Sequence, residues 1–356
     1  MNTYRADEGL AFMLRYENIA WYEDGKVRIL DRRCYPLETS FVVCEDHRQV
    51  AQAIADMVTQ SAGPYTACGM GMALAAYECR RMGAEDRKAY LRSAADTISH
   101  ARPTTAKRME AICGFCLEAA EDAIDRGLEN VDIIIRDRVV AMNNDRYDRI
   151  YRIAGYLADT FPENGHILTQ CFGETIVGMM LKVCRQRGKN IKLYCCETRP
   201  YFQGSRLTAT VCSEMGFDTT VITDNMVGYV MDNIGIDVFT CAADVITCDG
   251  HVVNKVGTMQ ISILAKHFGV PVYVTGEPDL GHPGRDSVTI EMRDPSSVLS
   301  ARGTPTAAEG VNAIYPAFDI TPPELVTGIV TCEGICAPQD LPAYAESKKG
   351  STEVTV

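Results

Sequence analysis

The spacing of apolar residues changes near residue 160. Between residue 46 and about residue 160, apolar side chains recur every three or four positions, as in the run Val50, Ile54, Met57 and Val58. That period is typical of amphipathic helices. After residue 160, short apolar runs alternate with helical patterns. Such alternation predicts parallel strands joined by helices, arranged as a doubly wound sheet.

The same periods predict the individual elements. In the first part of the chain we expect helices over 68–81, 89–99, 105–127 and 145–158, whereas 131–135 is compatible with a strand or a helix. In the second part we expect strands at 166–169, 191–196, 219–223, 237–241 and 270–275. Helices are expected between them at 175–187, 207–215, 226–234 and 256–268.

Residues 10–45 predict a small antiparallel sheet. The runs 19–22 and 27–30 flank an Asp24-Gly25 turn, and 41–44 is a candidate third strand. The predicted fold class is therefore α/β, with a mainly helical N-terminal domain (1–160) that carries this sheet. A Rossmann-like, doubly wound parallel sheet forms the C-terminal domain (161–356). The polar tail from about residue 345 is expected to be disordered.

Composition narrows the class of protein. The chain has 356 residues, of which 46% are hydrophobic and 23% are charged, and both fractions are ordinary for a globular protein. The net charge of -12 argues against nucleic acid as a partner, because phosphate backbones select basic surfaces. The sequence contains no signal-peptide pattern at its start and no apolar stretch of about 18 residues. We therefore expect a cytoplasmic protein that does not bind membranes.

The sequence contains fifteen cysteines. Many of them lie within apolar patterns, so we interpret most as small buried hydrophobic residues in a reducing compartment. Cys113 and Cys116 have the spacing of metal ligands, but no second pair follows at zinc-finger distance. The same argument applies to Cys332 and Cys336, and no metal site is expected.

Polar residues follow several of the predicted strands. In a doubly wound sheet, residues just beyond the strand ends converge on one crevice. The candidates are Cys171, Arg199, Gln203, Asp224, Asn225 and Asp244, with Asn254 and Lys255 in a later loop. No glycine-rich dinucleotide fingerprint and no Walker loop follows a strand, so a nucleotide cofactor is not expected.

Four segments of the chain together resemble the methylthioribose-1-phosphate isomerase family. They are Glu-Thr-Arg-Pro-Tyr-Phe-Gln-Gly-Ser-Arg-Leu-Thr at 197–208, Ile-Thr-Asp-Asn-Met at 222–226, Asn-Lys-Val-Gly-Thr at 254–258 and Tyr-Pro-Ala-Phe-Asp-Ile-Thr-Pro-Pro-Glu-Leu at 315–325. The wider superfamily includes ribose-1,5-bisphosphate isomerase and the regulatory subunits of translation initiation factor two B. The resemblance extends from about residue 15 to residue 335.

The resemblance implies an aldose–ketose isomerase of the methionine-salvage type, acting on a 5-substituted ribose 1-phosphate. It implies that Cys171 and Asp244 are catalytic, and that Arg102, Gln203, Asn254 and Lys255 bind the substrate; Arg199 of the same signature is a further candidate. It also implies a homodimer whose partner molecule is a small sugar phosphate, with no metal and no cofactor.

The chemistry of the reaction fits these residues. The sugar ring must be opened by an acid before C1 and C2 exchange oxidation state, and a partly desolvated Asp244 would be a suitable acid. Cys171 is expected at a helix N-terminus, where the thiolate is favoured, so it would act as the base. Lys255 and Arg102 would hold the phosphate. The hydrogen could move as a proton or as a hydride.

Each residue also has an ordinary structural interpretation. Cys171 could be one more buried cysteine, Asp244 and Arg102 could cap helices, and Lys255 could be a surface charge. The sequence also departs from the family around the expected crevice. The family's Arg-Gly-Ala-Pro segment is replaced by Gln-Ser-Ala-Gly-Pro-Tyr at 60–65, and Phe-Gly-Glu follows Cys171.

These departures leave the substrate open. One alternative is a related sugar phosphate, such as 5-deoxyribose 1-phosphate or ribose 1,5-bisphosphate. A second is a non-phosphorylated sugar, because a phosphate-binding arginine is missing. A third is a non-catalytic protein that senses a sugar phosphate or nucleotide, as the translation-factor subunits do; such a protein would not need both Cys171 and Asp244.

Overall fold

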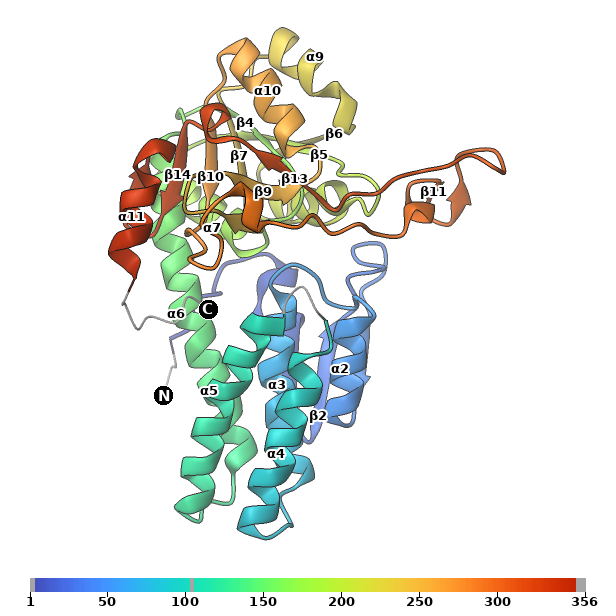
Figure 1. Ribbon diagram of the computed structural model, residues 1–356, viewed down its shortest axis with the longest axis vertical. Coiled ribbons are helices and arrows are strands. Elements are labelled where there is room, and N and C mark those ends of the chain that lie inside the picture. Colours follow the sequence, from blue (N-terminus) through green and yellow to red (C-terminus); the bar gives the residue numbers. More distant parts are fainter. Residues whose placement is uncertain (1–3, 103–105, 350–356) are drawn as a thin grey trace. The chain divides into compact units, whose positions relative to one another are not determined.

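The computed structural model describes residues 4–102 and 106–349. The chain forms two compact units, which we call unit 1 (up to Asp148) and unit 2 (from Arg149). The division falls within the long helix α6 (Val131–Asp159). The fold class is the expected one, with a small antiparallel sheet among helices in unit 1 and a large, mostly parallel sheet in unit 2 (Figure 1).

The small sheet of unit 1 is an antiparallel meander. It consists of β1 (Ala20–Glu23), β2 (Lys26–Leu30) and β3 (Phe41–Cys44). Glu23 pairs with Lys26, so Asp24 and Gly25 alone form the turn, with φ angles of 50° and 75°. Positive φ at both positions is the geometry that an Asp-Gly turn favours. The predicted hairpin is thus confirmed.

Helices make up the rest of unit 1. They are α1 (Tyr16–Ile19), α2 (His47–Ala55), α3 (Gly63–Glu78), α4 (Ala84–Ser99), α5 (Ala106–Asp125) and the first part of α6. Nearly every residue of α3 is buried. A Cβ at Gly69 would lie 2.7 Å from a methyl group of Val139, so this glycine permits close helix packing. The uncertain segment 131–135 is helical, because Val131, Ile135 and Val139 bury one face at a spacing of four.

The large sheet of unit 2 has seven strands in the order β15-β14-β10-β7-β4-β5-β6. All neighbouring pairs are parallel except β14 with β15. The strands are β4 (His166–Thr169), β5 (Lys192–Cys196), β6 (Asp218–Ile222), β7 (Val238–Ala242), β10 (Val272–Thr275), β14 (Gly328–Thr331) and β15 (Gly334–Cys336). The five strands expected from apolar runs are all present, whereas β14 and β15 were not predicted.

Helices lie on both faces of this sheet. They are α7 (Thr175–Gln186), α8 (Ala209–Glu214), α9 (Val227–Asn233), α10 (Thr258–Phe268) and α11 (Leu341–Lys348). In Figure 1, α9 and α10 cover one face of the sheet and α7 lies on the other. A π-helical turn (Gly204–Thr208) leads into α8. The expectation of disorder from residue 345 is wrong as far as residue 348, because Leu341 and Ala345 bury one side of α11.

A second small sheet, not predicted, joins β8 (Val245–Ile246), β9 (Val252–Lys255) and β13 (Phe318–Thr321) in antiparallel pairs. Asn254 and Lys255 therefore lie on strand β9, and their expected position in a loop is wrong. Between β10 and β13 the chain extends away from the sheet as an arm, residues 277–317, that ends in the hairpin of β11 (Ser300–Ala301) and β12 (Thr304–Pro305) (Figure 1).

Two wider expectations can be compared with the structure. Over the described ranges, no helix is long and apolar enough to cross a membrane. All fifteen cysteines fall within those ranges as free thiols, and most are buried, as the sequence predicted.

Gly204 provides a test of how tightly unit 2 is packed. A Cβ at this position would overlap the backbone carbonyl of Cys196, which cannot move without breaking the β5 strand end. We expect Gly204→Ala to lower the free energy of unfolding by about 3 kcal/mol. Gly114→Ala is the control, because a Cβ there meets only open space in the interior of α5 and should stabilise the helix by about 0.5–1 kcal/mol. Thermal denaturation of both variants would measure these changes. A neutral effect of Gly204→Ala would contradict this account.

Candidate active site

The strand order of the large sheet defines where a ligand can bind. From β4, the chain proceeds through β5 and β6 in one direction, and through β7, β10 and β14 in the other. The order therefore reverses between the neighbouring strands β4 and β7. Ligands of open α/β sheets bind beyond the strand ends at such a reversal. Cys171 follows β4 and Asp244 follows β7, so these two residues flank that position.

The backbone of Cys171 is held by residues from the neighbouring strand end. Its N–H donates to Oγ1 of Thr198 at 3.0 Å, and its carbonyl accepts a hydrogen bond from the hydroxyl of Thr208. Thr198 in turn donates to the carbonyl of Cys196 at 3.1 Å. The thiol-bearing residue is thus fixed by the Glu-Thr-Arg-Pro turn after β5 and by the π-helical turn beyond it.

Asp224 holds that turn in place. One carboxylate oxygen accepts from the N–H of Thr198 and the other from the N–H of Arg199, both at 2.8 Å. The sequence placed Asp224 among the candidate crevice residues. Its carboxylate instead orders the backbone that positions Cys171.

Positive φ angles gather in the two loops around Cys171. Among described residues other than glycine, half of those with positive φ lie here: Cys171 at 60°, Glu174 at 49°, Thr198 at 63° and Phe202 at 57°. This conformation is costly for a residue with a Cβ and persists only where its surroundings impose it. Clusters of such residues are typical of functional sites.

Burial dominates the ionisation of the Cys171 thiol. Desolvation raises its pKa to about 11, although the nearby Lys255 ammonium acts in the opposite direction. The expectation that the thiolate is favoured is therefore wrong for the ligand-free protein. Helix α7 begins only at Thr175, so its N-terminus does not stabilise a charge at Cys171. At neutral pH the thiol is protonated.

Lys255 is a buried cation next to this thiol. Only 4% of the residue is exposed, and Nζ donates to the carbonyl of Ala317 at 2.9 Å. Its ammonium lies 4.8 Å from the ring centroid of Phe318. Burial lowers its pKa, whereas the neighbouring Cys171 raises it. A phosphate at this position would favour the charged form of Lys255.

Asp244 and Asn254 occupy different environments. Asp244 is exposed, so the expected partial desolvation is absent. Its negative charge nevertheless acts to raise the pKa of both the Cys171 thiol and the Lys255 ammonium. Asn254 is buried, and its Nδ2 donates to Oγ1 of Thr258 at 3.0 Å. Thr258 also donates to Oε1 of Gln170 at 2.8 Å. Asn254 thus belongs to a network that fixes the start of α10 against the loop after β4.

Arg199 and Gln203 both lie on the signature turn. The guanidinium of Arg199 donates to the carbonyls of Ser300 at 3.0 Å and Val298 at 2.9 Å, so it anchors the arm. Gln203 is half-buried, and its Oε1 has no hydrogen-bond partner among the described residues. Of the two, Gln203 has the polar atom that a ligand could satisfy.

Three features that the sequence singled out remain: Arg102, the 60–65 segment and Glu174. Arg102 is half-buried and belongs to unit 1, and the rest of its Arg-Pro-Thr segment lies outside the described residues. A guanidinium does lie at the 60–65 turn of unit 1: Arg32, wholly buried, donates to the carbonyl of Gln60 at 2.7 Å. Glu174 is fully buried at the start of α7.

Sequence reasoning missed three residues of this site. Gln170 joins the network of Thr258, and Arg293 and Tyr315 come from the root of the arm. Both lie near Cys171: the Arg293 guanidinium acts to lower the pKa of the Cys171 thiol, and a Cys171 thiolate would raise the pKa of Tyr315. No local pattern marks Arg293, and Tyr315 lay within the fourth family segment without a role of its own. Within the described ranges, no group of three or more His, Cys, Asp or Glu side chains could hold a metal ion.

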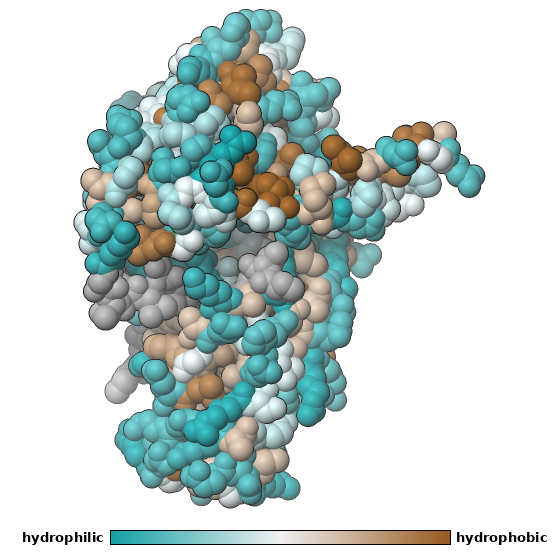
Figure 2. Space-filling model, in the orientation of Figure 1, coloured by the Kyte–Doolittle hydropathy of each residue, from teal (hydrophilic) through white to brown (hydrophobic). Residues whose placement is uncertain are grey.

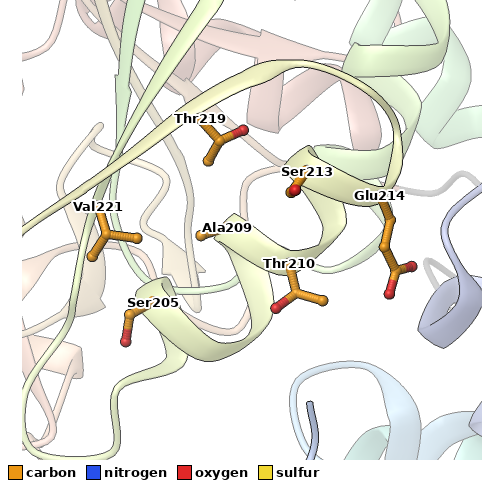
Figure 3. A pocket seen from close by; sticks show the side chains of 7 residues that line it. All are labelled: Ser205, Ala209, Thr210, Ser213, Glu214, Thr219 and Val221. Atoms are coloured by element: carbon orange, nitrogen blue, oxygen red, sulfur yellow. The ribbon is translucent and has the colours of Figure 1, made fainter. Parts of the chain in front are cut away.

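A separate hollow of about 320 Å³ lies at the edge of the sheet, between α8 and β6 (Figure 3). Ser205, Thr210 and Ser213 line it on one side, and Thr219 and Val221 on the other. Its described lining contains hydroxyl groups, methyl groups and the carboxylate of Glu214, but no cation. This hollow is therefore poorly suited to an anionic ligand and is distinct from the cluster around Cys171.

Comparison with known proteins decides the family. The model of the initiation factor 2 subunit family matches residues 65–338. The chain belongs to this family. Among its relatives, the methylthioribose-1-phosphate isomerase of Syntrophotalea carbinolica is 35% identical, over 88% of this chain and 94% of that protein. The enzyme of the same name from Desulforudis audaxviator is 32% identical, over 89% and 94%. The predicted resemblance is thereby confirmed.

Solved structures of the family share the fold. The 5-methylthioribose 1-phosphate isomerase of Pyrococcus horikoshii OT3 matches with a TM-score of 0.86 and 26% identity, over 97% of this chain and 99% of that one. The translation initiation factor eIF-2B subunit delta of A. fulgidus matches with a TM-score of 0.81 and 28% identity, over 92% and 99%. Fold similarity alone does not separate these two kinds of family member.

Alkylation would test the protonation state of Cys171. Because its thiol has a pKa of about 11, modification by iodoacetamide should accelerate about tenfold per pH unit from pH 7 to about pH 10. Peptide mass spectrometry would follow the Cys171 peptide, and Cys171→Ser would identify the signal. A rate that levelled off near neutral pH would mean that the thiolate is already formed there.

Proposed function

We propose that this protein is an aldose–ketose isomerase that converts a 5-substituted ribose 1-phosphate to the corresponding ribulose 1-phosphate, with methylthioribose 1-phosphate as the first candidate substrate. The observation that carries the proposal is the position of Cys171 and Asp244 on either side of the strand-order reversal, next to the buried cation Lys255. The names of the curated relatives support the same reaction.

The reaction balances without an external oxidant or reductant. Cleavage of the bond between C1 and the ring oxygen opens the sugar, and the ring oxygen takes up a proton. The C2 hydroxyl loses a proton, and the hydrogen on C2 moves to C1 as a hydride or through an enediol. C2 becomes a carbonyl carbon and C1 becomes a CH2 group. The protein therefore needs one proton donor and one proton acceptor, and we propose that it needs no cofactor.

Protonation of the ligand-free site suggests how the roles are divided. The Cys171 thiol carries a proton at neutral pH, because burial raises its pKa to about 11. We therefore assign Cys171 as the donor to the ring oxygen. Asp244 has carboxylate oxygens that can accept the proton of the C2 hydroxyl. This assignment reverses the roles expected from the sequence, where the aspartate was the acid and the cysteine the base.

The substrate phosphate requires cations and hydrogen-bond donors. We propose that Lys255 contacts the phosphate; Arg102 is a further candidate through the family resemblance alone. Gln203, whose Oε1 has no partner among described residues, would contact a sugar hydroxyl. Arg199 would act indirectly by anchoring the arm, and Asn254 by ordering the start of α10.

One specific observation favours a second function. The A. fulgidus eIF-2B delta subunit matches 92% of this chain, against 97% for the isomerase of P. horikoshii, so a non-catalytic, ligand-sensing protein is the runner-up. A sensor would need the phosphate-binding cations but not a thiol and a carboxylate flanking one crevice. The presence of both groups favours the enzyme.

We further propose that the protein acts as a homodimer in the cytoplasm. Several apolar side chains on α9 and α10 are exposed, including Tyr229 at 66% and Ile263 at 48%. Figure 2 shows apolar surface gathered over α10. Exposed apolar surface of this kind is typical of a contact with another chain.

A panel of sugar phosphates would test the reaction. Methylthioribose, 5-deoxyribose and ribose 1-phosphates, together with ribose 1,5-bisphosphate, would be incubated with the purified protein and followed by 13C NMR. We expect the C2 carbonyl signal of the ribulose product from at least the methylthio substrate, at the same rate with and without EDTA. Turnover of none of the four would contradict the enzyme proposal.

Two variants would test the catalytic roles. We expect Cys171→Ala and Asp244→Asn each to reduce kcat by a factor of about 100–10,000, the usual contribution of one acid or base. Cys184→Ala, at a buried cysteine on α7, and Asp218→Asn, at the opposite end of the sheet, are matched controls that should retain activity. Circular dichroism would establish that all four fold. Near-normal kcat in either test variant would remove that residue from the mechanism.

A further inference from the structure

The root of the arm is fixed against the site. Its two segments run antiparallel where they leave the sheet, with a bridge between Met292 and Pro316. The N–H of Arg293 donates to the carbonyl of Tyr315 at 2.8 Å. Arg199 fixes the segment farther out through the carbonyls of Val298 and Ser300. Tyr315 is therefore held at the root of the arm by backbone hydrogen bonding.

Tyr315 is packed into the cluster around Cys171. Only 2% of the residue is exposed. Its ring meets the ring of Tyr201 edge to face, with centroids 5.8 Å apart, and the Nζ atom of Lys255 lies 6.0 Å from its centroid. Cys171 is also close enough that its thiolate form would raise the pKa of Tyr315. The phenol is thus part of the wall formed by the signature turn and strand β9.

The hydroxyl of Tyr315 has no acceptor for its proton. Its oxygen is buried and has no hydrogen-bond acceptor among the described residues, although the guanidinium of Arg293 is close enough to act on it as a donor. The neighbouring charged group is the guanidinium of Arg293, which donates from Nε to Glu291 at 2.9 Å. A guanidinium has only donors, so it can never accept the phenol proton. Buried hydroxyl groups nearly always have an acceptor for their proton. A buried hydroxyl without an acceptor therefore points to a bound molecule.

We propose that Tyr315 is a substrate-binding residue that donates its hydroxyl hydrogen to an anionic oxygen of the bound sugar phosphate. Lys255 and Arg293 flank the phenol, so the acceptor best suited to this corner is a phosphate oxygen rather than a neutral hydroxyl. The contact would hold the sugar phosphate in a fixed orientation relative to Cys171. This inference rests on the proposed isomerase function and adds a binding residue to the same site.

Tyr315→Phe removes the hydroxyl and keeps the ring. Because the hydroxyl proton has no acceptor among the described residues, loss of the hydroxyl should leave Tm unchanged or slightly higher. With methylthioribose 1-phosphate, kcat/KM should fall about 10–100-fold, mostly through KM, as expected for one hydrogen bond to a charged group. The rise in Tm that saturating substrate produces should shrink correspondingly.

Tyr147→Phe is the matched control. Tyr147 is also fully buried, but its hydroxyl donates to the carbonyl of Leu14 at 3.0 Å in unit 1. This variant should lower Tm and leave kcat/KM unchanged, which is the opposite of the pattern expected for Tyr315→Phe. The pair separates a hydroxyl that serves the fold from one that serves the ligand.

The outcomes distinguish this inference from the proposed function. If the wild-type protein isomerises the substrate and Tyr315→Phe does so equally well, the inference fails and the isomerase stands. A fall in Tm for ligand-free Tyr315→Phe would also overturn it, because the hydroxyl would then serve the fold. If the wild type isomerises no sugar 1-phosphate, the test is the rise in Tm that ribose 5-phosphate produces in the wild type and in Tyr315→Phe. A rise that Tyr315→Phe loses supports the binding role, and no difference between the two proteins refutes it.

Discussion

The site depends on the way the end of β5 holds the residue after β4. Cys171 adopts a left-handed backbone conformation, which costs free energy for any residue with a Cβ. The Cys171 N–H donates to Thr198 and the Cys171 carbonyl accepts from Thr208, and these hydrogen bonds offset that cost; Asp224 fixes Thr198 in turn. Two adjacent parallel strands are therefore linked beyond their ends, in the place where an ordinary sheet would have only independent loops. The Glu-Thr-Arg-Pro signature thus makes the link between these two strand ends.

The same packing brings two ionisable groups into a dry environment. Burial raises the pKa of the Cys171 thiol and lowers that of the Lys255 ammonium, so each is shifted toward its neutral form. Attraction between a Cys171 thiolate and the Lys255 ammonium opposes both pKa shifts. It does not overcome the effect of desolvation on the pKa of Cys171. A phosphate group would add negative charge beside Lys255 and favour its ammonium form. A bound phosphate would thus stabilise the charged form of Lys255 and leave the Cys171 thiol protonated.

Local periodicity predicted the elements that bury one face or a whole strand. The runs that became β4, β5 and β7 are apolar because helices cover both faces of the sheet. That pattern is visible in the sequence. The strand that carries Asn254 and Lys255 was missed because β9 is short, and its pairing partner β13 lies more than sixty residues away. The pKa of Cys171 was misjudged for a similar reason. A helix N-terminus can be predicted locally, whereas desolvation depends on residues brought from the arm and from β9.

The site residues divide in the same way. Cys171 and Asp244 could be found because each directly follows an apolar run, and the family segments identified Lys255 and Gln203. The anchoring role of Arg199 and the position of Arg293 depend on the arm, whose contacts no sequence spacing encodes. The arm is also the part of unit 2 that lies outside the regular sheet and its helices. A fold shared by isomerases and by a translation-factor subunit leaves function to such additions. In this chain, the arm places a buried phenol beside Lys255 and a guanidinium near Cys171, and the doubly wound sheet itself supplies neither group.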